Sequence, residues 1–105
     1  MDNTKNEEIS MTIIANAGEA RGLAFEALRA ARDAGDFDKA KKLMDEANKY
    51  SQIAHQAQTD LLVATANGEQ VPIDVLLIHS QDHLMTAMLA IDLITELIES
   101  YKKNK

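Results

Sequence analysis

Apolar residues recur at intervals of three and four positions through most of the chain, which places them on one face of a helix. The spacing runs over about residues 5–33, returns over about 37–66, and returns again over about 72–102. Each segment of about 30 residues corresponds to a helix about 45 Å long at 1.5 Å per residue. The pattern therefore predicts three long helices and no strand.

Residues typical of helix ends stand at the boundaries of these segments. Thr4 and Glu7 have the spacing of a capping box, so Thr4 is predicted to cap the first helix. Gly35 and Asn67-Gly68 favour the ends of the first and second helices. Pro72 suits the first turn of the third. Such short connections make successive helices antiparallel neighbours, so residues 1–105 are predicted to form one all-α domain, an up-down-up three-helix bundle.

The apolar faces differ in width between the three predicted helices. The first is expected to bury Ile9, Ile13, Ala17, Ala20, Ala24, Ala27, Leu28 and Ala31. The second is expected to bury Phe37, Ala40, Leu43, Met44, Ala47, Tyr50, Ala54, Leu61 and Leu62. The third is apolar over far more than one face, at Val75, Leu76, Leu77, Ile78, Leu84, Met85, Met88, Leu89, Ile91, Leu93, Ile94, Leu97 and Ile98. Since one side of each helix of a three-helix monomer faces outward, the outer side of the third helix is expected to meet other subunits.

Composition and charge narrow the class of protein. The chain of 105 residues carries a net charge of −6, which disfavours nucleic acid and anionic membranes as partners. It contains no cysteine, so disulfides and thiolate metal sites are excluded. The first ten residues, MDNTKNEEIS, lack the apolar core of a signal peptide, and no apolar run approaches a membrane span of roughly 18 residues. We therefore expect a cytoplasmic protein without direct membrane insertion.

Polar residues interrupt the third helix in the stretch HSQDH, residues 79–83. At 100° per residue, His79 and His83 share one face. Asp82 lies about 60° to the side, on a stripe with residues 75, 78, 85 and 89 that has coiled-coil spacing. The stretch thus splits into a histidine face and an acid on a hydrophobic seam.

The histidine face allows three interpretations. The pair can be structural, with one ring packed in the core and one exposed. It can share a metal ion, since histidines four residues apart on a helix can do so, although the glutamate of the zinc-protease motif H-E-x-x-H is absent. It can also be nucleophilic, with one histidine accepting a phosphoryl group and its neighbours hydrogen-bonding the ring or the phosphate.

The stretch LLIHSQDHLMTAMLAIDL, residues 76–93, closely resembles the signature of the lactose/cellobiose-type enzyme IIA of the bacterial sugar phosphotransferase system. Residues 18–32, GEARGLAFEALRAAR, resemble the first helix of that family, and residues 54–62, AHQAQTDLL, resemble its second helix. The resemblance thus covers nearly the whole chain.

The resemblance implies a function and an assembly. His79 would be the catalytic residue that accepts a phosphoryl group from phospho-HPr and passes it to enzyme IIB, for uptake of a β-linked disaccharide such as cellobiose, chitobiose or lactose. Gln81 and His83 would support it, and no organic cofactor would be needed. The family fold is a homotrimer with a nine-helix body. Asp82 would lie on the trimer axis, where it would hold a divalent cation such as Mg²⁺.

Two rival functions remain at this stage. One is a non-catalytic, trimeric helical module that binds or regulates and holds a structural divalent metal. The two functions differ at His79, which would become phosphorylated in a carrier and would not in such a module. The other, a metal enzyme in a helical bundle, is disfavoured because such sites use Glu-x-x-His motifs on facing helices, and the chain has none.

Overall fold

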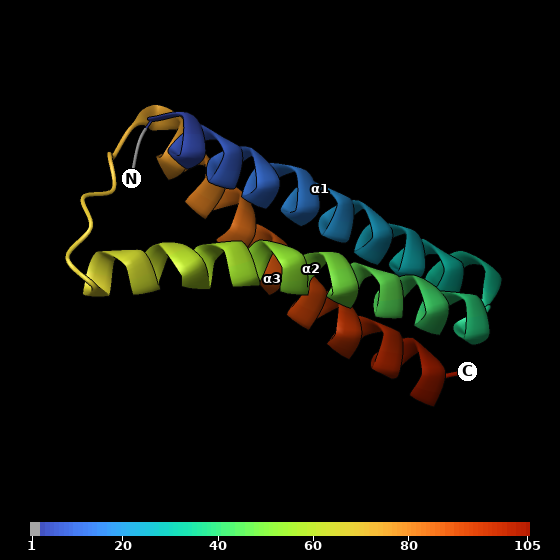
Figure 1. Ribbon diagram of the computed structural model, residues 1–105. Helices are drawn as coiled ribbons and strands as arrows, with labels where there is room; N and C mark the ends of the chain where they lie inside the picture. The colour runs from blue at the N-terminus through green and yellow to red at the C-terminus, as the bar shows by residue number, and fades with distance from the viewer. Residues whose placement is uncertain (1–2) are drawn as a thin grey trace.

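The computed structural model describes residues 3–105 as three α-helices: α1 (Asn3–Ala34), α2 (Phe37–Ala66) and α3 (Val75–Lys103). They form a rod with principal extents of 52 × 20 × 18 Å, with the start of α1 and the end of α3 at opposite ends of the rod (Figure 1). α2 runs back along α1, and α3 then runs in the direction of α1. α1 packs extensively against both other helices, whereas α2 and α3 contact each other much less. The predicted all-α, up-down-up three-helix bundle is confirmed.

Backbone geometry at the helix ends explains where α1 and α2 stop. Gly35 and Gly68 adopt positive φ values of 62° and 85°, which glycine reaches without steric cost. Beyond Gly35, the N–H of Asp36 donates to the carbonyl of Ala30 at 3.0 Å, which closes the helix end. The Asp36 side chain then accepts from the N–H of Lys39 at 3.0 Å and caps α2. The chain therefore reverses direction within two residues.

Two predicted helix starts are wrong. α3 begins at Val75 instead of Pro72, because Asp74 has an extended backbone and its side chain accepts from the N–H of Leu77 at 2.8 Å. This aspartate is the N-cap, so the proline precedes the helix. Thr4 lies inside α1, which is already helical at Asn3, so Thr4 is not its N-cap. The residues before Asn3 lie outside the part of the chain that the structure describes.

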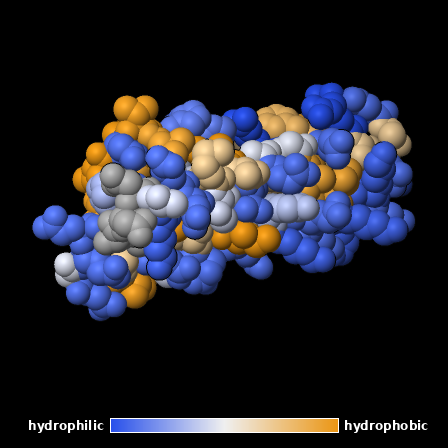
Figure 2. Space-filling model, turned by 45° about the horizontal axis from the view of Figure 1, so that its top comes forward, coloured by the Kyte–Doolittle hydropathy of each residue, from blue (hydrophilic) through white to orange (hydrophobic). Residues whose placement is uncertain are grey.

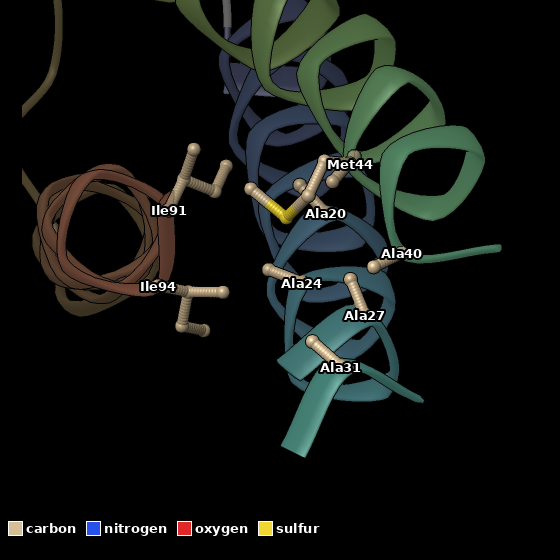
Figure 3. Close-up of a cluster of buried hydrophobic side chains, with 9 residues drawn as sticks. Ala20, Ala24, Ala27, Ala31, Ala40, Met44, Ile91 and Ile94 are labelled. Atoms are coloured by element: carbon tan, nitrogen blue, oxygen red, sulfur yellow. The ribbon is translucent and has the colours of Figure 1, made fainter. Parts of the chain in front are cut away.

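The core consists of two clusters stacked along the rod. The first, towards the C-terminus of α3, contains Ala20, Ala24, Ala27, Ala31, Ala40, Met44, Ala47, Ile91 and Ile94. In Figure 3, Ile91 and Ile94 of α3 point towards the alanines of α1, and Met44 closes the gap from α2. The second cluster contains Ile13, Ala17, Ala54, Leu61, Leu84 and Ala87. Alanines on α1 let both neighbours approach closely, while larger side chains fill the space between them.

The predicted face of α2 is partly wrong. Leu62 is 60% exposed and Tyr50 is 36% exposed, whereas Ala64, which the pattern omitted, is buried. The buried arc of α2 is narrower than its apolar pattern because α2 packs mainly against α1 and makes few contacts with α3.

Large apolar side chains remain on the surface of α3. We call them the exposed row: Val75, Ile78, Met85, Leu89, Leu93 and Leu97. Their exposed fractions run from 82% at Val75 to 44% at Leu97. Figure 2 shows hydrophobic patches that interrupt an otherwise hydrophilic surface, most of them towards one end of the rod. The predicted excess of apolar surface on this helix is therefore confirmed for a single protomer. No helix among residues 3–105 is long and apolar enough to cross a bilayer.

Candidate functional site

The predicted site lies in the first half of α3, between two faces of that helix. The buried face carries Ser80, Leu84, Ala87, Ile91 and Ile94, which pack towards the rest of the bundle. The exposed row lies on the outer side. At 100° per residue, His79 and His83 fall between the two faces. They therefore border both the bundle and the unpaired apolar surface.

The two histidines contact each other directly. Their Nε2 atoms are 3.1 Å apart, which is hydrogen-bonding distance for a proton held on one of the two rings. The ring centres are 4.4 Å apart and the ring planes are nearly perpendicular, at 80°. Because the nitrogens are closer than the ring centres, the nitrogen ends of the rings converge. His79 is exposed and His83 is partly buried, so His79 is the more accessible of the two.

Gln81 points away from the histidines. Its Nε2 donates to Oε1 of Gln58 on α2 at 2.6 Å, and it approaches the Ser80 hydroxyl at 3.4 Å. A separation of two residues on a helix corresponds to 200°, so Gln81 and His79 lie on nearly opposite sides of α3. The sequence did not predict the contact of Gln58 with Gln81, because no local pattern links positions 23 residues apart. The pair ties α2 to α3 beside the site.

Asp82 lies with the exposed row and is itself exposed. Its carbonyl accepts a hydrogen bond from the Thr86 hydroxyl at 2.8 Å. Within residues 3–105, no group of three or more metal-ligating side chains comes together. A cation bound by Asp82 would therefore need further ligands from other copies or from water.

Buried polar contacts fix the start of α3, which carries the site. Asn6 is buried, and its Nδ2 donates to the carbonyl of Pro72 at 3.3 Å, which joins α1 to the segment before α3. The buried Ser80 hydroxyl donates to the carbonyl of Leu77 at 2.6 Å. The sequence did not single out Asn6, since a polar residue near a helix start normally faces solvent. This contact joins the first turn of α1 to the segment that leads into α3.

His55, the third histidine, lies elsewhere. It is exposed on α2, and its carbonyl accepts a hydrogen bond from the Thr59 hydroxyl at 3.0 Å. No hydrogen bond in the described residues connects His55 with the pair on α3.

An accessible histidine beside an unpaired apolar row suits a carrier protein that exchanges a small group with other proteins. The comparison with protein families agrees with this class. Residues 8–102 match the family described as "PTS system, Lactose/Cellobiose specific IIA subunit". The chain belongs to this family, and it is a phosphocarrier component of a sugar phosphotransferase system. The resemblance seen in residues 76–93 is confirmed.

Individual relatives support the assignment over nearly the whole chain. The chain is 47% identical over 103 residues to the lactose-specific EIIA component of Staphylococcus epidermidis, with 98% of each chain covered. The crystal structure of the cellobiose-specific enzyme IIA from Bacillus anthracis matches with a TM-score of 0.90 and 42% identity, covering 98% of this chain and 92% of that one. A solution structure of the IIA(Chitobiose)–HPr complex from the Escherichia coli system matches with a TM-score of 0.79 and 45% identity, covering 93% and 94%.

Proposed function

We propose that His79 accepts a phosphoryl group from HPr and passes it to the enzyme IIB partner of the same system. The observation that carries the proposal is the exposure of His79, which a group exchanged between two protein partners requires. A relative with 45% identity is known in complex with HPr, and the same kind of partner fits this chain. The negative charge of −6 would assist association with a basic partner surface.

The transfer step uses the Nε2 atom of His79, which is the ring nitrogen farthest from the backbone. Its lone pair attacks phosphorus, the bond from phosphorus to the donor breaks, and the electron pair of that bond stays on the donor. Such a reaction needs mainly positioning and charge stabilisation. His83, whose Nε2 is 3.1 Å away, would donate its N–H to a phosphoryl oxygen once the two rings separate. Gln81 would support the site indirectly, by holding α3 against Gln58.

We further propose that the protein assembles as a homotrimer through the exposed row. Six large apolar side chains, each at least 44% exposed, are more than a stable monomer normally leaves on one face of a helix. Threefold packing of three α3 helices would cover this line and produce a nine-helix body. The histidine pair would then lie at the boundary of the interface, still open to partners.

Asp82 would gain its role only in that assembly. Three carboxylates brought together in an apolar interface repel one another unless protons or a cation compensate. Carboxylate oxygens suit a hard divalent cation such as Mg²⁺. Asp82 is exposed beside the row, so its carboxylate could bind a divalent cation. The other ligands would come from the two symmetry-related copies.

The sugar that the system takes up would be a β-linked disaccharide. Relatives with 42–47% identity are described as specific for lactose, N,N'-diacetylchitobiose or cellobiose. Three different sugars at similar identity are expected if this subunit carries only the phosphoryl group and does not contact the sugar.

The decisive experiment measures phosphorylation with purified enzyme I, HPr and labelled phosphoenolpyruvate. His79→Ala should abolish the label on this protein, whereas His55→Ala, which removes another exposed histidine, should leave it unchanged. His83→Ala should slow labelling without abolishing it. Circular dichroism would show that all three variants remain helical.

Two outcomes would overturn the assignment. One is full labelling of the His79→Ala protein. The other is loss of label only in the His83→Ala protein, which would make His83 the acceptor. A wild-type protein that never takes up label would favour the alternative of a non-catalytic helical module.

A further inference from the structure

We propose that the His79–His83 pair is also a binding site for one borderline-soft divalent cation, with Zn²⁺ as the representative ion. The two Nε2 atoms would be its protein ligands. The binding itself does not depend on the phosphoryl-carrier role, but its consequence for transfer rests on the function proposed above for His79.

The distance between the nitrogens already fits a shared ion. Zinc binds imidazole nitrogen at about 2.0–2.1 Å, so two nitrogens on one ion lie about 2.9–3.4 Å apart for ligand angles of about 90–110°. The observed separation is 3.1 Å. The ring centres are 4.4 Å apart, so the rings converge through their nitrogen ends. The helix backbone therefore holds two ligands at a spacing that one ion can bridge.

The chemistry of the surroundings selects the type of ion. Imidazole favours zinc, copper and nickel over magnesium and calcium. The chain has no cysteine to compete for such an ion, and His55 stands apart on α2. Since His79 is exposed, water can complete the coordination. The Asp82 carboxylate lies with the exposed row and favours harder cations. The histidine site and the Asp82 site would therefore differ in both ligand type and position.

Occupancy of the pair would exclude phosphorylation. The lone pair of His79 Nε2 that would attack phosphorus is the same lone pair that would bind the ion. A bound ion therefore blocks the nucleophile, and a phosphoryl group on His79 removes one of the two ligands. Zinc would thus act as a reversible inhibitor of this carrier, and phosphorylation would release zinc.

Isothermal titration of the purified protein with Zn²⁺ tests the site directly. We expect one ion per protomer. His79→Ala and His83→Ala should each weaken binding by about two orders of magnitude, because the second ligand no longer acts at high effective concentration. His55→Ala should bind as the wild type does. An excess of Mg²⁺ should not displace the zinc.

Phosphotransfer assays test the consequence. Saturating Zn²⁺ should stop labelling of the wild-type protein, and a chelator should restore it, while labelling of HPr by enzyme I in the same buffer controls for effects on the donors. Equal zinc affinity in the wild type and the His79→Ala protein would overturn the site. Tight binding through both histidines in a protein that HPr does not label would leave the site standing and overturn the proposed function instead. Full labelling at saturating zinc would show that bound zinc does not block phosphorylation of His79.

Discussion

Truncation of one side chain in the exposed row gives a quantitative test of the trimer. Leu89 is 58% exposed in the protomer and lies near the middle of the row. Full burial of a leucine side chain stabilises by about 1.5–3 kcal/mol, so covering the exposed part contributes about 1–2 kcal/mol per protomer. Leu89→Ala removes most of this contribution three times in a trimer, or about 3–5 kcal/mol in all.

This loss changes the assembly equilibrium measurably. A cost of about 3–5 kcal/mol raises the trimer dissociation constant by about two to four orders of magnitude. The trimer dissociation constant has units of concentration squared, so the midpoint concentration scales as its square root and rises by about one to two orders of magnitude. Sedimentation velocity over a wide range of protein concentrations would measure the midpoint, and circular dichroism would check that the helices remain.

A matched control separates interface burial from a general effect of losing a leucine. Leu62→Ala makes the same truncation at a side chain that is 60% exposed on α2, outside the row. The control should keep the wild-type midpoint. The reasoning is refuted if the wild-type protein sediments as a monomer throughout, or if both variants shift the midpoint equally.

Four further substitutions test the site helix, the helix caps and the buried polar groups. Asp82→Leu, which completes the row, should keep the trimer and raise its resistance to heat and chelator, and a melting temperature below that of the wild type would contradict this. Asp74→Ala removes the acceptor for the Leu77 N–H and should lower the free energy of unfolding in urea by about 1 kcal/mol. Asp36→Ala is the equivalent change at the start of α2 and should have a similar effect. Unchanged stability in both variants would contradict the capping roles. Ser10→Ala removes a buried hydroxyl that has no hydrogen-bond partner in the described structure, so stability should be unchanged or higher by up to about 1 kcal/mol; a clear loss in urea unfolding would show that the hydroxyl has a partner.

The sequence by itself determined the features that depend on neighbours along one helix. A period of 3.6 residues defined three helices and indicated that α3 carries more apolar surface than one three-helix bundle buries. The same geometry brought His79 and His83 together, because residues four apart on a helix are always adjacent. Gly35 marked the end of α1 for a similarly local reason, since few other residues adopt its positive φ.

Only the tertiary structure decided which helix faces meet and at what register. The bonds from Gln81 to Gln58 and from Asn6 to Pro72 join residues 23 and 66 positions apart, and no periodicity encodes such pairs. Leu62 continues an apolar pattern yet faces outward, because a helix buries only the arc that its neighbours cover. Local sequence specifies the shape and polarity of each helix, whereas close packing of the alanine face of α1 fixes how the other helices lie against it.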